Sequence, residues 1–350
     1  MKKARLLEDD RHWNGVCSNL SFSRRYKIMD TGTHLLIGAT LGGLASSLAD
    51  PALFSHSTVV YGLFAATIIG STAPDFDAVI RIRSYKSYLQ HHRGFSHSLL
   101  MLAGWPVVLA PLIALAFHAW AYLIPIFLWT MAGVVLHVIL DFFNAYGVQC
   151  FRPVSRKWFH ANTIPIFDPV LFVLHAAGLL LWLFGVFGAT AIFPFVYALT
   201  FLFIGCRILI GRLMLQHVRR QYGMAGYSFL IPRGLPHKWK YVHETGQAYI
   251  TGSIHGLILK EEAIFEKGEQ NDVIQAVMGS DGVRTFLQFT HRVHISCQKV
   301  QNGYRVELRD IRFRHGHNLP FGMDVMLDER LLVTGDTIGW RKKIWEPPFA

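Results

Sequence analysis

The stretch WAYLIPIFLWTMAGVVLHVILDFF, residues 120–143, determines the kind of protein that this chain forms. It is long enough to cross a bilayer, because a helix needs roughly 20 apolar residues to span a hydrocarbon core of about 30 Å. Two ionisable residues, His137 and Asp141, interrupt it near one end. A carboxylate inside such a helix costs about 2.5–3.5 kcal/mol on insertion scales, and such residues normally have a partner and a function. The stretch therefore predicts a membrane helix that carries a polar site.

Apolar segments of similar character recur along the first two thirds of the chain. Hydrophobic residues make up 52% of the sequence and charged residues 16%, whereas soluble domains carry about 25% charged residues. Together with residues 120–143, the other segments predict about six transmembrane helices in a mainly α, polytopic bundle. The other five cover residues 34–49, 57–73, 97–117, 168–187 and 189–211. The first two are short and rich in small residues such as Gly38, Gly42 and Gly43, which favours close helix packing.

Basic residues are distributed unevenly among the loops of this predicted bundle. Lys and Arg precede the first segment, follow the second, fourth and sixth, and are absent near 50–56, 118–119 and 187–189. This alternation follows the positive-inside rule and predicts an inner-membrane, multi-pass protein with both termini in the cytoplasm. The net charge of +11 is then explained by loops that face anionic lipid, and no nucleic acid partner is expected.

The composition divides the chain into three parts. Residues 1–28 are charged and lack an apolar core, so we interpret them as a disordered leader and expect the natural start at Met29. Residues 29–220 form the predicted transmembrane domain. Residues 221–350 predict a small β-rich cytoplasmic domain, because several segments are rich in Val, Ile and Tyr and are separated by Gly. These segments are Ala248–Leu259, Val293–Val300, Tyr304–Phe313 and Leu331–Thr334. The four cysteines form no CxxC pair and are expected to be free thiols.

Imidazole and carboxylate side chains gather at the predicted cytoplasmic helix ends. The spacing of His137 and Asp141 places both on one helix face, where they can bind one ion. Pro74 is expected to end the second helix and to free the two carboxylates that follow it. Mixed ligands of this kind suit zinc, with manganese or iron as alternatives. The seven candidate ligands exceed the number that one ion needs and predict one or two divalent ions. They are His34, Asp75, Asp77, His92, His97, His137 and Asp141.

Some of these residues also have structural interpretations. A histidine at a membrane boundary is often merely interfacial, and Asp75 and Asp77 could be carboxylates of a helix end. Asp168, in Phe-Asp-Pro, is either the N-cap of the next helix or an additional ligand. Ser96 is expected to cap a helix or to hydrogen-bond a ligand rather than to act as a nucleophile. His175 lies deep in its helix and is not included among the ligands.

Four blocks carry a resemblance to a known family. They are Met-Asp-Thr-Gly-Thr-His at 29–34, Ala-Pro-Asp-Phe-Asp at 73–77, His-Arg-Gly-Phe-Ser-His-Ser at 92–98 and His-Val-Ile-Leu-Asp at 137–141. In this order they resemble the LexA-regulated, inner-membrane-associated metal-dependent hydrolases, in particular the YfhP-like proteins of bacilli. The resemblance covers about 29–215 and continues through Tyr304–Phe321. It implies a metal-dependent hydrolase that begins at Met29, and it favours His92 over His91 as the ligand.

These observations predict a metal-dependent hydrolase at the cytoplasmic membrane face, with a metal-activated water as nucleophile. Arg93 and Asp77 are the predicted catalytic residues, Arg93 by neutralising an anionic group. The basic loops favour a small-molecule or lipid phosphoester as substrate and membrane lipid as partner. Two other hypotheses remain open. A metal-ion or proton transporter would show polar residues near the midplane and internal repeats, and a non-catalytic scaffold would hold a structural metal in a closed site.

Overall fold

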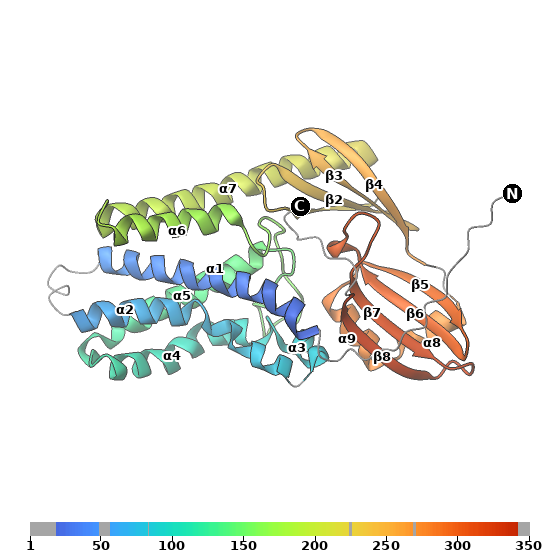
Figure 1. The fold of residues 1–350 in the computed structure, drawn as a ribbon, viewed down its shortest axis with the longest axis horizontal. Coiled ribbons are helices and arrows are strands. Elements are labelled where there is room, and N and C mark those ends of the chain that lie inside the picture. Colours follow the sequence, from blue (N-terminus) through green and yellow to red (C-terminus); the bar gives the residue numbers. More distant parts are fainter. Residues whose placement is uncertain (1–18, 49–56, 83, 224–225, 269–270, 342–350) are drawn as a thin grey trace.

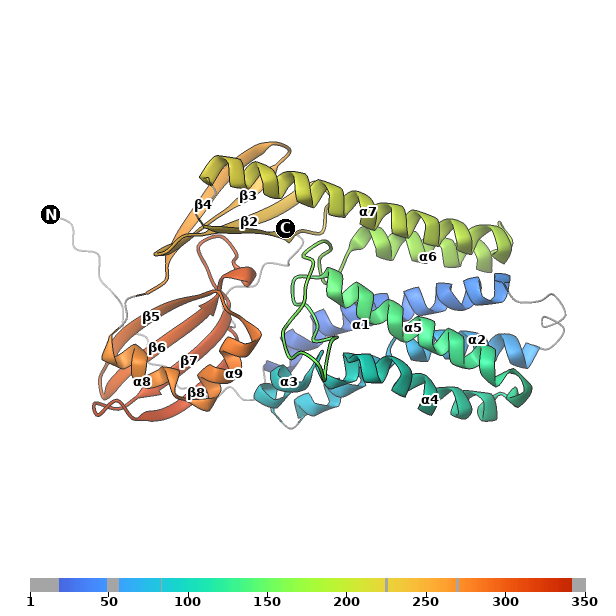
Figure 2. The same ribbon diagram turned by 180° about the vertical axis from the view of Figure 1, so that it is seen from behind.

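The computed structural model describes residues 19–48, 57–82, 84–223, 226–268 and 271–341. A bundle of helices occupies one half of the long axis, and two β-sheets occupy the other half (Figure 1, and from behind in Figure 2). Most of the expected leader, residues 1–18, lies outside the described residues. Helix α1 begins at Asn19, so its first turns precede Met29.

The helical part contains long α-helices joined by short 3-10 helices and one irregular loop, residues 144–168. In chain order the helices are α1 (Asn19–Leu48), α2 (Ser57–Gly70), η2 (Ala73–Ile82), α3 (Tyr85–His91), η3 (Phe95–His97), α4 (Leu99–Ala116), η4 (Trp120–Tyr122), α5 (Leu123–Phe143), α6 (Pro169–Leu183) and α7 (Ala189–Tyr222).

Fewer helices qualify as membrane spans than the six that the sequence predicts. Among the described residues, three are long and apolar enough by themselves: Leu99–Ala116, Trp120–Phe143 and Ala189–Tyr222. A fourth is possible if α2 and the first part of η2, which are bent by 46° relative to each other, form one broken span. Helix α6 is apolar but has only 15 residues, and the first half of α1 contains Arg24, Arg25 and Lys27. By length and composition, the described residues therefore contain three candidate spans, or four if the bent pair is counted as one span.

Glycines allow α2 and α5 to approach closely. A Cβ atom at Gly70 would lie 2.5 Å from the carbonyl oxygen of Thr130, and one at Gly133 would lie 2.9 Å from the backbone nitrogen of Ser71. Gly38 of α1 is similarly close to Ser71, since its Cβ would lie 2.1 Å from the hydroxyl oxygen. The expected packing role of small residues is thus confirmed at Gly38. These contacts fix the register of α1, α2 and α5, the helices that carry much of the candidate site.

Helix α7 continues well beyond residue 211, where the apolar segment of the sequence ends. Its later turns present Ile210, Met214 and Val218 to a cluster that contains Trp239 and Tyr241. This spacing of four residues keeps the apolar side chains on one helix face. The helix therefore leaves the apolar bundle and becomes the support of the first β-sheet.

The C-terminal part confirms the predicted β-rich composition and consists of two four-stranded antiparallel sheets, each with its strands in sequence order. The first sheet contains β1 (Tyr227–Pro232), β2 (Lys238–Glu244), β3 (Ala248–His255) and β4 (Ile258–Glu266). The second contains β5 (Val293–Val300), β6 (Gly303–Asp310), β7 (Phe321–Leu327) and β8 (Val333–Trp340). Two helices that the sequence analysis did not predict, α8 (Asp272–Met278) and α9 (Asp281–Phe289), precede the second sheet.

The second sheet and its helices contact the end of the bundle. Leu89 of α3 belongs to the same apolar cluster as Phe286 and Phe289 of α9. The side-chain amide of Gln90 donates a hydrogen bond of 2.8 Å to the hydroxyl of Thr285. Tyr146, from the loop after α5, packs against Phe289 with ring centroids 5.9 Å apart. The C-terminal part is therefore docked on the bundle end from which His92 and the 144–168 loop extend.

Candidate metal centre

All seven predicted ligands lie on elements that meet at this end of the bundle. Helix α2 ends at Gly70, whose carbonyl would need the N–H that Pro74 lacks. The chain continues as the 3-10 helix η2, which carries Asp75 and Asp77. His92 follows α3 directly, and His97 ends η3. The remaining three come from longer helices: His34 from α1, and His137 and Asp141 from the last turns of α5.

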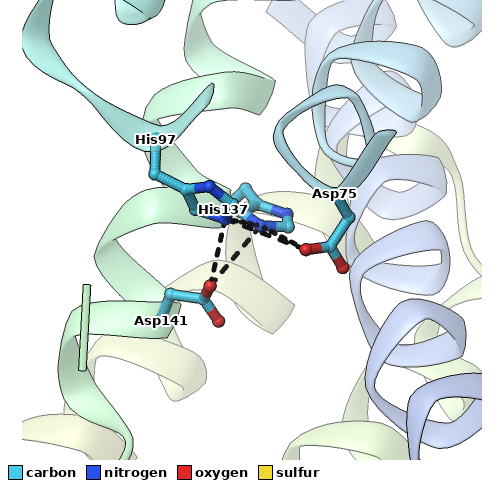
Figure 3. A group of neighbouring side chains, drawn as sticks. All are labelled: Asp75, His97, His137 and Asp141. Carbon is cyan, nitrogen blue, oxygen red and sulfur yellow. Dashed lines mark hydrogen bonds and ion pairs between the residues drawn. The ribbon is translucent and has the colours of Figure 1, made fainter. Parts of the chain in front are cut away.

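Four of these side chains form one compact group: Asp75, His97, His137 and Asp141 (Figure 3). Each offers one ligand atom, and the four atoms lie within 4.8 Å of one another. His97, His137 and Asp141 are buried, and Asp75 is partly buried. Helix spacing places His137 and Asp141 together on α5, and tertiary packing brings Asp75 and His97 to them from η2 and η3.

The hydrogen bond of His137 determines which ring nitrogen faces the group. Its Nδ1 lies 2.7 Å from the backbone carbonyl oxygen of Ser71. A carbonyl can only accept, so Nδ1 carries the proton and donates it. The neutral ring therefore presents a bare Nε2 to the other three residues, which is the arrangement found in histidines that bind metals.

His97 is oriented in the same way by a two-step relay. The hydroxyl of Ser96 donates to Oδ2 of Asp77 at 2.5 Å, and its oxygen lies 2.9 Å from Nδ1 of His97. Because the hydroxyl proton is used on the carboxylate, His97 Nδ1 must be the donor to Ser96. In the neutral form of this ring Nε2 is bare, and it lies 3.2 Å from Nε2 of His137. The two lone pairs repel each other unless a cation lies between them.

The two carboxylates of the group have matching unsatisfied acceptors. Asp141 Oδ2 lies 3.3 Å from His97 Nε2 and 3.7 Å from His137 Nε2. Asp75 Oδ1 lies 3.8 Å from each of the same nitrogens. Both oxygens are buried and accept no hydrogen bond, although buried polar atoms almost always have a partner. Two imidazole nitrogens and two such oxygens fit a zinc-type divalent cation.

A second group shares Asp75 with the first. Asp75, Asp77 and His92 also offer ligand atoms within 4.8 Å of one another. His92 Nδ1 donates to Oδ1 of Asp77 at 2.7 Å, so its Nε2 is the bare nitrogen. A carboxylate common to two ligand groups is what a bridged pair of ions requires.

His34 and Arg93 lie beside these groups rather than within them. The His34 ring stacks on His137 with centroids 3.9 Å apart, and its Nε2 is 3.7 Å from Asp141 Oδ1. The Arg93 guanidinium lies 2.9 Å from Asp141 Oδ1 and donates to the side-chain oxygen of Asn144 at 3.0 Å. Arg93 is thus held by groups of the protein itself, which differs from the predicted contact with a substrate anion.

A pocket reaches the metal centre from the side of α1 and α6. Its walls include His34 and Asp141, and apolar residues surround them. Asp168 also lines it, and its Oδ1 accepts hydrogen bonds from the backbone nitrogens of Val170 and Leu171. The N-cap role that the sequence left open is therefore confirmed for Asp168. Asp141, although buried, therefore lies in the wall of a small pocket beside the candidate centre.

Two residues outside the predicted set complete the site. The Ser71 carbonyl orients His137, and Asn144 binds both Arg93 and, through its side-chain nitrogen at 3.2 Å, Asp141. A backbone carbonyl leaves no mark in a sequence, so only the packing of α2 on α5 could identify Ser71. His175, which the sequence analysis did not include, hydrogen-bonds Thr40 and Thr200 in the bundle, so its contacts are structural.

Ser96→Ala is expected to weaken metal binding by about 10- to 100-fold, because outer hydrogen-bond partners of metal ligands contribute by about that factor. The substitution removes the hydroxyl that orients His97 and leaves the ligands themselves in place. Competition with a chromogenic chelator measures the affinity. Ser47→Ala is the matched control, because the Ser47 hydroxyl donates to the Leu44 carbonyl within α1. Equal affinities for the two variants would contradict this role of Ser96.

Two family profiles match separate parts of the chain. A family profile described as "YdjM inner membrane protein" matches residues 29–214, and one described as "YfhP C-terminal alpha/beta plait domain" matches residues 272–345. The protein YfhP of Bacillus subtilis (strain 168) is 31% identical over 316 residues, which are 89% of this chain and 95% of YfhP. No solved structure matches the chain. The chain is therefore a YfhP-like member of the YdjM family of inner membrane proteins.

Proposed function

We propose that this protein is a membrane-bound, metal-dependent hydrolase whose centre lies at the cytoplasmic membrane face. One observation carries the proposal. Two neutral imidazoles direct bare Nε2 atoms at each other at 3.2 Å, beside two buried carboxylate oxygens that accept no hydrogen bond. Without a cation, the nitrogen lone pairs and the carboxylate oxygens repel one another in a buried site. With a cation between them, the same atoms become its ligands.

The residues divide into those that would hold ions and those that orient them. Asp75, His97, His137 and Asp141 would hold the first ion, and Asp75, Asp77 and His92 a second. Divalent ions bound there would supply Lewis-acid and water-activating chemistry at neutral pH. Ser96 and the Ser71 carbonyl fix the imidazoles, and Arg93 balances the charge of Asp141.

The membrane setting of the proposal comes from the sequence and the family. Six helices with basic loops on one side would place the centre at headgroup depth, with both termini in the cytoplasm. Phosphoesters, either lipid-linked or small, are the substrate class that suits basic loops and paired ions.

Metal analysis and turnover test the proposal together. The purified protein is expected to contain stoichiometric zinc, manganese or iron and to hydrolyse at least one member of a phosphoester panel in a metal-dependent way. Asp141→Asn should lose turnover, because the neutral amide is a poor ligand. His255→Ala, at an exposed position in β3, should retain it. A metal-loaded protein that hydrolyses nothing would refute the hydrolase.

A non-catalytic scaffold is the second candidate, because the first group offers four protein ligands, three of them buried, as structural zinc sites do. The pocket beside Asp141 favours the hydrolase over this closed site. Transport is tested separately, by metal-ion flux into proteoliposomes, and flux abolished by Asp141→Asn would favour a transporter.

A further inference from the structure

The loop that follows α5 carries an arginine that the site described above does not use. Arg93, the cation expected to meet a substrate, is bound to Asp141 and Asn144. Arg152 lies in the 144–168 loop, which is hydrogen-bonded to the His-Arg-Gly-Phe-Ser-His segment on both sides. The Gln149 amide donates to the Arg93 carbonyl at 2.9 Å, and the Leu99 amide donates to the Cys150 carbonyl at 2.9 Å.

Arg152 lies directly against this segment. A Cβ atom at Gly94 would lie 3.3 Å from Nη1 of Arg152 and 2.7 Å from the His91 carbonyl oxygen. Glycine at position 94 therefore leaves space for the guanidinium. Gly94 is two residues from His92 and three from His97, so the cation is adjacent to the backbone that carries ligands of both groups.

The charge of Arg152 is not balanced by the protein. Its Nε is buried and has no hydrogen-bond partner, and no ion pair of Arg152 occurs among residues 19–341 where the structure describes them. Burial and the positive charge of Arg156 both lower the pKa of the Arg152 guanidinium. Arg156 therefore repels Arg152 rather than neutralising it. A partly buried guanidinium whose Nε donates to no acceptor is unfavourable, and an anion at this place would supply the acceptor.

The surroundings of Arg152 are those of a membrane surface. Phe151 and Val154 are exposed, Val154 by 87%, and so are Phe95 and Leu99 on the adjoining segment. Arg156 and Lys157, which are exposed, follow in the same loop. Apolar side chains interleaved with cations fit a layer in which acyl chains and anionic headgroups meet.

We propose that Arg152, supported by Arg156, binds the phosphate of an anionic membrane lipid whose acyl chains lie against Phe95, Phe151 and Val154. The guanidinium fork would donate hydrogen bonds to two phosphate oxygens, a geometry that lysine does not reproduce. The lipid site itself does not depend on the proposed function. Its role does, because bound lipid would deliver a phosphoester to the adjacent metal centre only if that centre is hydrolytic.

Titration of the detergent-purified full chain with phosphatidylglycerol, followed by native mass spectrometry, tests this site. Arg152→Gln is expected to weaken lipid binding by about 10-fold or more, the loss that a charge-assisted pair implies. Arg220→Gln removes the same charge from an exposed position near the end of α7 and should bind like the wild type. Equal binding by the two variants would overturn the proposal.

Further arms separate the possible outcomes. Val154→Asp, at a solvent-exposed position, offers Arg152 a carboxylate without disturbing the core and should also weaken lipid binding. This variant tests the site if Arg152→Gln does not fold. Binding of phosphatidylcholine as strong as that of phosphatidylglycerol, or of inorganic phosphate with displacement of the lipid, would refute the anionic lipid as ligand. His137→Ala should bind lipid normally, because it leaves Arg152 in place. Lipid binding by the metal-loaded wild type without turnover of any phosphoester would reject the hydrolase and keep the lipid site.

Discussion

Replacing His137 by alanine is expected to remove the bound metal and to reduce any hydrolytic activity to background. The substitution deletes one of the two Nε2 atoms that face each other at 3.2 Å. His97 then remains as the single imidazole of the first group. A site with three remaining ligands loses affinity by about 100-fold or more, since even partners outside the ligand set contribute about 10- to 100-fold. Elemental analysis of the purified variant gives the metal content directly.

Thermal unfolding provides an independent measure of the same change. At a free metal concentration of about 100 times Kd, the wild type should gain about 2.7 kcal/mol of stability, whereas His137→Ala at that concentration should gain almost none. The variant should fold without added metal, because it loses a repulsive contact together with the Ser71 hydrogen bond. His255→Ala serves as the control. If His137→Ala retained the full metal-induced stabilisation, the ligand role of His137 would be wrong.

Gly133→Val is expected to destabilise the protein by about 1–3 kcal/mol or more, the range for overpacked interiors. Even the first added atom would lie 2.9 Å from the Ser71 nitrogen and from the Thr67 carbonyl oxygen, so α2 and α5 must separate. Because the Ser71 carbonyl orients His137 at 2.7 Å, metal affinity should decrease as well. Unfolding followed by circular dichroism and chelator competition measure the two effects.

Gly205→Val is the matched control for this prediction. It places the same side chain in another apolar helix, α7, where a Cβ atom meets nothing within 4 Å. Its helix propensity cost is the same, so the difference between the two variants isolates the contact between α2 and α5. Similar stability and similar metal affinity for the two variants would contradict a close approach of these helices.

The candidate site could be predicted largely from local sequence. His137 and Asp141 are four residues apart in an apolar helix, and this spacing alone places them on one face. Asp75 and Asp77 follow a proline that ends a helix, and the fold groups both with histidines that could bind a metal. The geometry groups six of the seven predicted residues, and His34 lies against them by stacking on His137.

Other features were beyond the reach of sequence patterns. Hydrophobicity along residues 57–73 and 168–187 predicts spans, but α2 bends into η2 and α6 stops after 15 residues. Helix α9 is short and amphipathic, and in the sequence its apolar residues resemble those of a strand. Only the structure shows that Phe286 and Phe289 pack on the second sheet from a helix. The separation of the β-rich part into two sheets depends on strand pairing between distant residues, which local periodicity does not encode.

The amino-acid sequence by itself determined the membrane class of this chain, the β-rich character of its last third and the residues that can bind a metal, because hydropathy, β propensity and ligand chemistry are properties of single side chains and their spacing. Tertiary structure alone decided that Asp75 is shared by two ligand groups and that Arg93 binds Asp141. It also decided that the buried Nε of Arg152 has no hydrogen-bond partner among the residues that the structure describes. These are distances between segments far apart in the chain, and they are set by how the helices pack.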